Sequence, residues 1–305
     1  MLQYVLRKVA HTVVVAFGVL TLAFVALRMS GDPAAMMVPP DASLQDVQAW
    51  RHELGLDVPL YQQYFRFLGD AVRGEFGMSF KHGVPAWTLV TERIWATGEL
   101  ALVALGLALA IGIPVGVLSS VKRGSWYDWV SMMLAVFGQA TPSFWLGLML
   151  ILLFSVQIPL FPTGGRGDWR HLVLPGITLG TFFAASVARL TRSSMLEVLG
   201  AEYVLTARSK GLGEGLVILK HALKNALIPI VTLVGLQLGS LLGGAVVTET
   251  IFAWPGAGRL IIFSISYRDY PVVQAAVFLL AMVYVAINLT VDLLYGFFDP
   301  RVRVE

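Results

Sequence analysis

The stretch EVLGAEYVLTARSKGLGEGLVILKHALKNALIP, Glu197–Pro229, is the longest polar interruption between apolar segments in the C-terminal half of the chain. Its first part, Glu202–Lys210, has the composition of a short helix. Gly211 and Gly213 follow, and glycine readily takes the positive φ angles at which helices end. The sequence therefore predicts a short helix that closes in a tight turn, with positive φ at both glycines.

The predicted helix has two different faces, because residues three to four positions apart lie on the same side of a helix. The face that can dock onto another surface holds Tyr203, Val204 and Ala207. The residues that project elsewhere and can stay in water are Thr206, Arg208 and Lys210. Such a helix suits a soluble partner that grips a membrane protein. An ordinary basic cytoplasmic loop is the alternative that these residues leave open.

A second helical segment is expected to begin near Glu214, since a carboxylate is favourable at a helix N-terminus. Its apolar residues recur at helical spacing, and they are Leu216, Leu219, Leu223 and Leu227. Pro229 is expected to bend this helix into the next apolar segment.

The composition places the chain in a lipid bilayer. Hydrophobic residues make up 57% of the 305 positions and charged residues only 13%, whereas soluble proteins average about 45–50% and 25%. The net charge of +3 is modest, so no nucleic acid partner is expected. The absence of cysteine excludes disulfides and thiolate chemistry, and the five histidines form no metal-ligand spacing. Membrane lipid is thus the expected surrounding of the chain.

We expect six membrane-spanning helices in an all-α protein. The first apolar run follows Arg7 and Lys8 and contains about 19 residues, enough to cross a hydrocarbon core of about 30 Å. It is longer than the apolar part of a signal peptide and lacks a small-residue cleavage site, so we interpret it as a retained span. The six predicted spans are Val9–Leu27, Glu99–Ser120, Trp129–Gln157, His171–Thr191, Leu223–Val247 and Tyr270–Phe297.

Prolines and glycines within these spans predict bent and closely packed helices. The prolines inside or at the edges of the spans are Pro114, Pro142, Pro175 and Pro229. Small-xxx-small pairs on the fifth span predict a tight interhelical face, and they are formed by Gly235, Gly239 and Gly243.

The polar region at 29–97 is expected to be an ordered helical loop outside the membrane. Ser43 and Asp46 resemble a capping box for a helix that ends at Gly55. Pro59 starts a second helix, which is expected to reach Gly74. The aromatic residues of this loop indicate amphipathic helices that rest on the membrane or on the rest of the protein. A small soluble cap that contacts a partner is the alternative.

The expected organisation has three parts. Residues 1–28 form the N-terminal end and the first span, and residues 29–97 form the helical loop. Residues 98–305 form a five-helix transmembrane core, which includes a cytoplasmic segment at 197–229.

Lysine and arginine residues in the short loops predict the orientation of the chain, because they concentrate on the cytoplasmic side. One side collects Arg7, Lys8, Lys122, Arg123, Arg189, Arg192, Arg208, Lys210, Lys220, Lys224, Arg301 and Arg303. The other side has Arg166, Arg170, Arg259 and Arg268. We therefore expect both termini and segment 197–229 in the cytoplasm, and loop 29–97 outside.

No residue pattern in the sequence indicates catalysis. The spans carry no chain of carboxylates and histidines that could move protons, which argues against an ion-coupled carrier. His52 and Glu53 begin like a zinc protease motif, but the second histidine is missing. None of the lysines is followed by serine or threonine, so the chain has no phosphate-binding loop. We expect no catalytic residue, metal or cofactor in this chain, and the energy for any uphill transport must come from another polypeptide.

The segment 202–229 resembles the cytoplasmic signature of permease subunits of ABC importers, in the dipeptide, oligopeptide and nickel branch. The residues that carry this resemblance are Glu202–Gly211, Leu212, Val217, His221 and Leu223–Pro229. Leu205, Thr206 and Ala207 depart from the general importer consensus, as do His221 and Lys224, and the last two departures are similar to the peptide branch.

The resemblance extends over nearly the whole chain. In the N-terminal third it is carried by Gly31-Asp32-Pro33, Leu54–Asp57, Pro59-Leu60, Gly74–Gly77 and Ser79. In the C-terminal half it is carried by Gly243-Gly244, Thr248-Glu249, Trp254–Gly256, Gly258–Leu260, Asp269–Pro271, Asn288, Asp292–Tyr295 and Asp299–Arg303. This ending is similar to that of the subunit with the longer first periplasmic loop.

The resemblance implies the type I importer fold in the bacterial inner membrane and a particular set of partners. These are a second, homologous permease subunit, two ABC ATPase subunits that hold ATP and Mg²⁺, and a periplasmic or lipid-anchored substrate-binding protein. Peptides are the implied substrates, with nickel or metal chelates, glutathione, opines or peptide-like siderophores as alternatives. A freestanding channel or a membrane scaffold is the alternative from a different class.

The resemblance also assigns candidate site residues. Those expected to contact the ATPase are Glu202, Tyr203, Thr206, Ala207, Arg208, Lys210 and Gly211. A weaker candidate contact for the binding protein is formed by Trp254, Pro255, Gly256 and Arg259. Separately from the resemblance, the candidates for the lining of the transport pathway are Gln139, Ser143, Gln237 and Ser240. For Gln139 and Gln237 an interhelical hydrogen bond is the favoured alternative.

Overall fold

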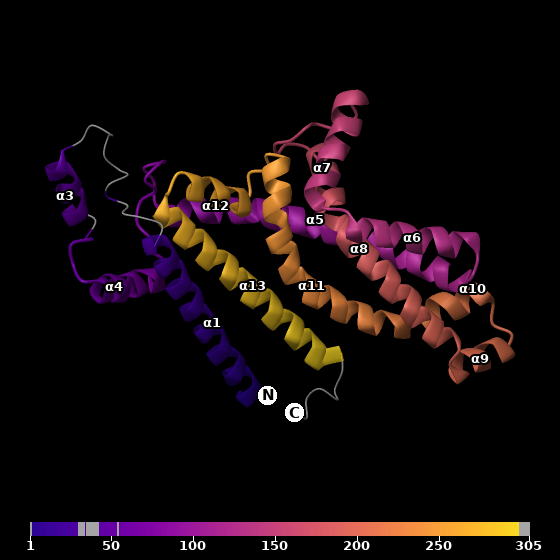
Figure 1. Ribbon diagram of the computed structural model, residues 1–305. Coiled ribbons are helices and arrows are strands. Elements are labelled where there is room, and N and C mark those ends of the chain that lie inside the picture. Colours follow the sequence, from indigo (N-terminus) through magenta and orange to yellow (C-terminus); the bar gives the residue numbers. More distant parts are fainter. Residues whose placement is uncertain (1, 30–33, 35–42, 54, 299–305) are drawn as a thin grey trace. The chain divides into compact units, whose positions relative to one another are not determined.

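The computed structural model describes residues 2–29, 34, 43–53 and 55–298 (Figure 1). The quoted features Gly31-Asp32-Pro33 and Asp299–Arg303 lie outside the described residues. The described residues are helical apart from turns, loops and one isolated antiparallel bridge between Met78 and Pro85. The predicted all-α fold class is confirmed.

The helices in the N-terminal half are α1 (Leu2–Met29), α3 (Leu44–Glu53), α4 (Leu60–Val72), α5 (Ala86–Val121), α6 (Trp126–Ala140), α7 (Ser143–Ile151) and the π-helix η1 (Leu152–Gln157). Those in the C-terminal half are α8 (Arg170–Leu199), α9 (Glu202–Ser209), α10 (Glu214–Leu216), the π-helix η2 (Val217–Ala222), α11 (Leu223–Ile251), α12 (Ala257–Ser266) and α13 (Tyr270–Phe298).

Five of the predicted spans correspond to helices of suitable length and composition. Four described segments can cross a membrane alone: α5, α8, the continuous segment Glu214–Ile251, and Tyr270–Val291 of α13. The pair α6 and α7–η1 is the fifth if it counts as one broken span. The first predicted span lies in α1, whose described apolar portion, Thr12–Ala26, is shorter. α5 begins at Ala86, well before the predicted start at Glu99.

The third predicted span, Trp129–Gln157, is wrong as a single helix because it bends by 104° between α6 and α7. Pro142 cannot donate a backbone hydrogen bond, and it disfavours helical geometry in the residue before it. Thr141 accordingly has an extended backbone with ψ 124°. The sequence predicted a bend in this span from Pro142, but not its size of 104°.

The chain divides into two compact units, and it passes between them within α5, between Trp254 and Pro255, and within α13. Unit 1 contains Met1–Ala96 and Pro255–Leu289. Unit 2 contains Thr97–Trp254 and Thr290–Glu305.

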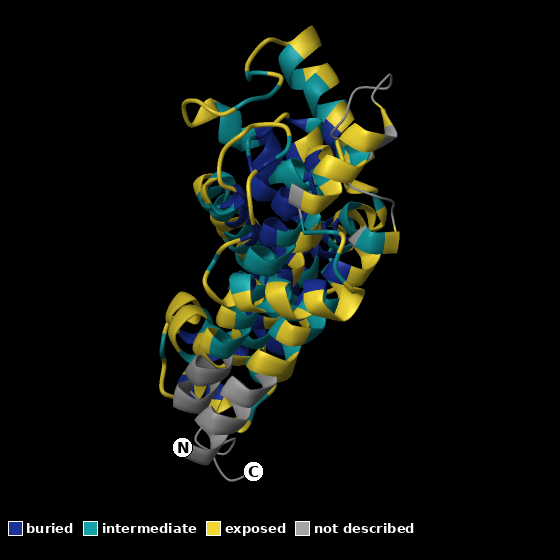
Figure 2. Ribbon diagram, turned by 90° about the vertical axis from the view of Figure 1, so that its left-hand side faces the viewer, coloured by how far each residue is buried: buried dark blue, intermediate teal, exposed yellow. Residues whose placement is uncertain are grey.

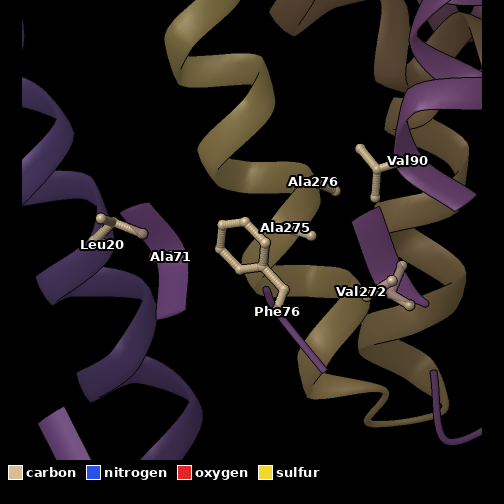
Figure 3. Close-up of a cluster of buried hydrophobic side chains, with 8 residues drawn as sticks. Leu20, Ala71, Phe76, Val90, Val272, Ala275 and Ala276 are labelled. Atoms are coloured by element: carbon tan, nitrogen blue, oxygen red, sulfur yellow. The ribbon is translucent and has the colours of Figure 1, made fainter. Parts of the chain in front are cut away.

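Unit 1 is built around an apolar cluster that joins α1, α4, α5 and α13 (Figure 3). Figure 3 shows the ring of Phe76 beside α13, with Leu20 and Val90 in the same cluster. Phe76 stacks on Trp87, with ring centroids 5.7 Å apart. Because Phe76, Leu20, Val90 and Val272 are fully or nearly buried, this cluster fixes the predicted loop region against α1, α5 and α13.

The predicted helices of the loop region are confirmed. The Asp46 carboxylate accepts from the Ser43 backbone N–H at 2.9 Å, and Ser43 Oγ accepts from the Asp46 N–H at 3.3 Å, which completes the capping box of α3. Gly55 and Gly74 both have positive φ where the helices end. The amphipathic α4 rests on α1 through Tyr64, whose hydroxyl lies 2.6 Å from Thr21 Oγ1. Resting on the protein, one of the expected alternatives, therefore holds for α4.

Unit 2 is organised around α8, which packs against α6, α7 and α11. Glycines allow α5 to approach α8 closely. A Cβ on Gly112 would lie 2.8 Å from the Ala184 carbonyl oxygen, and one on Gly116 would lie 2.6 Å from that of Ala188. The tightest glycine contacts of the described spans therefore include this pair on α5, which agrees with the close helix approach expected from the frequent glycines of the spans.

The predicted glycine face on the fifth span is confirmed only in part. A Cβ on Gly235 would lie 2.2 Å from Cγ1 of Val291 on α13, whereas one on Gly243 would meet no atom within 4 Å. Large apolar side chains on the outer sides of the spans are exposed, and they include Leu102, Leu134 and Leu236. Figure 2 shows such exposed residues in yellow along the helices, as expected for surfaces that contact lipid or other subunits.

We expect Gly116→Ala to lower the stability of the protein because the added methyl group would overlap α8. Overpacking of this kind costs about 1–3 kcal/mol. Gly106→Ala is the matched control on the same helix, since its Cβ would meet no atom within 4 Å. The thermal unfolding midpoint in detergent should fall for Gly116→Ala and stay level or rise for Gly106→Ala. Equal midpoints for the two variants would contradict close packing at Gly116.

Candidate coupling site

The candidate site is the α9 hairpin, which we define as residues 200–216. It lies at one end of unit 2, where α8 ends and α10 begins (Figure 1). α8 ends at Gly200, and the extended backbone of Ala201 (ψ 147°) starts α9. The chain then returns through Gly211 and Gly213 to α10. α9 is therefore tethered at both ends to long helices of the same unit.

The buried face of α9 packs onto the start of the next long helix. Val204 and Val217 are fully buried and Ala207 is nearly so, and these three residues form one apolar cluster. Val198 of α8 and Leu212 of the turn pack against it. The predicted docking of Val204 and Ala207 is confirmed. This small cluster joins α9 to both α8 and η2.

Tyr203 does not belong to the buried face, contrary to the prediction from its spacing. Its side chain is 44% exposed, and its hydroxyl accepts a hydrogen bond from Asn225 Nδ2 at 2.9 Å. The polar hydroxyl is satisfied at the edge of the helix, where the ring stays accessible to a partner. Tyr203 thus bridges the outer face of α9 to the first turn of α11.

The outer face of α9 combines apolar and charged side chains that are exposed. Besides Tyr203 it includes Glu202, Leu205, Thr206, Arg208 and Lys210. Arg208 forms a bidentate ion pair with Glu214 across the hairpin, with nitrogen–oxygen distances of 2.6 and 3.1 Å. This hydrogen bonding raises the pKa of Arg208, so its guanidinium stays charged. Lys210 has no such partner among the described residues, which leaves its ammonium available at the tip of the hairpin.

Gly211 ends the helix as predicted, with φ +76° and its N–H donating to the Arg208 carbonyl at 2.9 Å. A Cβ here would meet no atom within 4 Å, so backbone conformation and not space favours glycine. The corresponding prediction for Gly213 is wrong, because its φ is −60° and it serves as the N-cap of α10.

The leucine stripe predicted for the second helix does not form its buried face. Leu216 is 46% and Leu219 is 65% exposed. The buried residues of this segment are Val217, Ala222, Ala226 and Ile230. Its first turns form the π-helix η2, in which the wider turn shifts the side chains relative to α-helical spacing. α11 then continues through Pro229 to Ile251.

Two polar contacts that sequence reasoning missed tie α8 to neighbouring helices. Arg192 of α8 donates to both Asp128 carboxylate oxygens, at 2.6 and 2.8 Å. Asp128 is buried and also accepts from the Ser119 hydroxyl and from the Gly124 N–H. The hairpin between α5 and α6 is thereby fixed to the last turns of α8, the helix that leads into α9. The sequence indicates for Arg192 only a role in setting the orientation of the chain.

The predicted pathway residues lie at different places in unit 2. Gln139 is engaged between helices, since it accepts from Arg189 at 2.5 Å and donates to Ser186 at 3.3 Å. Ser143 and Ser240 are exposed, and Gln237 is half-buried. The lining of the pathway by these four residues stays a prediction.

The four residues predicted to contact a binding protein divide between the two units. In unit 2, Trp254 is buried and donates its backbone N–H to Glu249 at 2.8 Å. In unit 1, Gly256 is buried as the N-cap of α12, whereas Pro255 and Arg259 are half-buried. The Trp254 ring is thus not at the surface, and Pro255 and Arg259 are the accessible members of this set.

The sequence matches two family models that together cover most of the chain. One is described as "Binding-protein-dependent transport system inner membrane component" and matches residues 112–304. The other is the N-terminal membrane component of the same kind of transport system and matches residues 1–101. The chain belongs to this family. It is therefore a multi-pass membrane component of a binding-protein-dependent transport system, and we refer to it as the permease.

Curated relatives match the permease over its full length. It is 42% identical over 306 residues to the glutathione transport system permease protein GsiC of Escherichia coli (strain K12), with 100% of each chain covered. It is 43% identical over 340 residues to the dipeptide transport system permease protein DppB of the same strain, with 99% of each chain covered. Membership of this permease family, inferred from the 202–229 signature, is confirmed.

Solved structures support the fold. The permease resembles a chain of the MetNI methionine ABC transporter in an inward-facing conformation, with a TM-score of 0.56 and 22% sequence identity. The match covers 68% of the permease and 94% of the transporter chain. The importer permease fold expected from the sequence is confirmed.

We expect Val204→Asn to release α9 from η2, because a buried amide without hydrogen-bond partners costs about 1–3 kcal/mol. Leu205→Asn is the matched control, since Leu205 is adjacent but 52% exposed. Trypsin should cleave the detergent-purified permease after Arg208 and Lys210 faster in Val204→Asn than in the wild type. Leu205→Asn should keep the wild-type cleavage rate, and equal rates in both variants would contradict the docking of α9.

Proposed function

We propose that this chain is the membrane-spanning permease subunit of an ATP-driven importer, and that the outer face of α9 is the surface gripped by an ABC ATPase. The observation that carries the proposal is the construction of the α9 hairpin. One face is buried against its own protein, and the opposite face presents exposed apolar and charged residues. A surface of mixed apolar and basic character suits a soluble protein partner.

The ATPase supplies the chemistry that this chain lacks. ATP and Mg²⁺ belong to the partner subunits, since the permease sequence contains no phosphate-binding loop. The proposed contact residues are Glu202, Tyr203, Thr206, Ala207, Arg208, Lys210 and Gly211. The side chain of Ala207 is buried and does not contact the ATPase directly. Its role is to hold α9 in place by packing in the cluster with Val204 and Val217.

The packing of α9 provides a route for movement from the ATPase to the spans. A displacement of α9 acts on α8 through the short connection at Gly200 and on η2 through the cluster of Val204, Ala207 and Val217. α8 and α11 pack against each other along unit 2. We propose that closure of the ATPases moves these helices together, so that the pathway opens alternately to the two sides of the membrane.

The proposed orientation places the α9 hairpin and both termini in the cytoplasm, and the loop at 29–97 on the periplasmic side of the inner membrane. The uneven distribution of lysine and arginine supports this arrangement. A second, homologous permease subunit would complete the pathway, two ATPases would bind below it, and a periplasmic or lipid-anchored binding protein would deliver the substrate from above.

Small peptides are the proposed substrates. The curated relatives that match the full length of the chain are named for dipeptide and glutathione transport, and both compounds are peptides with free carboxylates. The relatives support this class but leave the individual peptide open. Nickel or metal chelates, opines and peptide-like siderophores are the alternatives that the sequence resemblance allowed.

We expect Gly211→Asp to leave membrane insertion intact but to abolish transport, because it places a negative charge beside Lys210 on the ATPase-facing turn. Gly211→Asn is the matched control, since Asn has the same shape and both residues tolerate positive φ better than most. The measurement is substrate-stimulated ATP hydrolysis by the complete complex in proteoliposomes, together with co-purification of the ATPase. Gly211→Asn should keep most activity. Full stimulated hydrolysis in Gly211→Asp would refute the proposed role of this turn.

A further inference from the structure

Unit 1 contains a cavity of about 250 Å³ that the coupling site does not use. It lies between the turn at 79–83, the N-terminal part of α5, and α12 with the turn that follows it. Its charged and ionisable lining residues are Lys81, His82, Arg93, Arg259, Tyr267 and Asp269. We name this cavity the basic pocket. All of its lining residues belong to unit 1.

A buried carboxylate builds one wall of the basic pocket. Asp269 is 1% exposed and accepts from the Ser79 hydroxyl at 2.5 Å and from the Phe80 N–H at 3.1 Å. The Lys81 N–H approaches the same carboxylate at 3.4 Å. The Ser79 hydroxyl in turn accepts from the His82 N–H at 3.0 Å. Because buried hydrogen bonds to a carboxylate are strong, Asp269 holds the 79–82 turn in one conformation.

This turn places positive charge at the pocket. The Lys81 ammonium lies 3.0 Å from the centre of the Tyr267 ring, a cation–π contact that keeps it on the pocket wall. Arg93 lines the cavity from α5, and Arg259 lines it from α12 with its guanidinium 5.1 Å from the Phe263 ring. Lys81 and Arg93 have no ion-pair partner within 4 Å among the described residues.

Basic side chains outnumber acidic ones in the lining of the pocket. Asp269 is its single acidic lining residue and already accepts hydrogen bonds from the 79–82 turn, whereas Lys81 and Arg93 line the pocket without an ion-pair partner among the described residues. Apolar and aromatic residues such as Leu260, Phe263 and Tyr267 complete the wall. A pocket of this composition suits an anion with an apolar neighbour.

We propose that the basic pocket binds a carboxylate presented from the outer side of the membrane. This inference rests on the proposed function, which places unit 1's loop region outside and makes peptides the transported class. A carboxylate matches arginine and lysine donors in charge and geometry. The cavity has room for one such group with its adjoining chain. The carboxylate comes either from the C-terminus of a peptide or from an acidic side chain of the binding protein. In both cases the pocket recognises the same chemical group.

The test compares the wild type with the double variant Lys81→Gln and Arg93→Gln in the complete complex, reconstituted in nanodiscs of zwitterionic lipid. Arg73→Gln is the matched control, because Arg73 is an exposed cation of the same loop region that does not line the pocket. The first arm measures binding of radiolabelled dialanine and of dialanine amide without binding protein. The second arm measures the affinity of the ligand-free binding protein at low and high salt.

In one of the two arms we expect the double variant to bind its ligand with about tenfold lower affinity. A loss of this size is typical when close charge pairs are removed from an interface. A peptide ligand predicts that dialanine binds better than its amide in the wild type and that the double variant removes this preference. An acidic side chain of the binding protein predicts weaker binding of that protein and a smaller salt dependence. Arg73→Gln should behave as the wild type in both arms.

The inference is overturned if the double variant matches Arg73→Gln in both arms. Co-purification of the ATPase separates this result from failure of the proposed function. A complex that retains its ATPase but shows no carboxylate response refutes the pocket alone, whereas a wild-type permease that never associates with an ATPase refutes the proposed function.

Discussion

The packing of Val204 and Ala207 against Val217 is the contact on which the proposed coupling depends. Without it α9 would be a solvated helix on two flexible turns, and a partner that moved it would move nothing else. The contact is small, since its three buried residues are two valines and one alanine. It is nevertheless placed where α8 ends and the segment Glu214–Ile251 begins. A partner that displaces α9 therefore acts on two spans at once.

Polar contacts and close glycine packing hold the helices of unit 2 together. The ion pair between Arg192 and Asp128 fixes the α5–α6 hairpin to α8, and glycines at 112 and 116 let α5 lie directly against α8. Close packing and buried hydrogen bonds resist local deformation. The regular α-helical structure of unit 2 is interrupted by the 104° bend between α6 and α7 and by the π-helices η1 and η2. We infer that motion enters through α9 and is shared by the helices around α8.

Features that depend on neighbouring residues in the sequence were predictable. The Ser43–Asp46 capping box and the positive φ of Gly211 follow from local geometry, and apolar length located the spans. Features that depend on tertiary packing were not. Tyr203 has the spacing of a buried residue but turns outward to Asn225, and Leu216 and Leu219 are exposed although they lie at helical spacing. The Ser79–Asp269 contact joins residues 190 positions apart, so no local pattern could reveal the basic pocket.

Site-specific cross-linking tests the central claim most directly. The chain contains no cysteine, so Leu205→Cys would carry a single photoactivatable probe at the centre of the exposed face of α9, and Trp126→Cys, also exposed in unit 2, would serve as the control position. Illumination of the complete complex in native membranes should link residue 205 to the ATPase subunit. Labelling of residue 205 by a membrane-impermeant reagent added from the periplasmic side, or the absence of any ATPase adduct, would contradict the account.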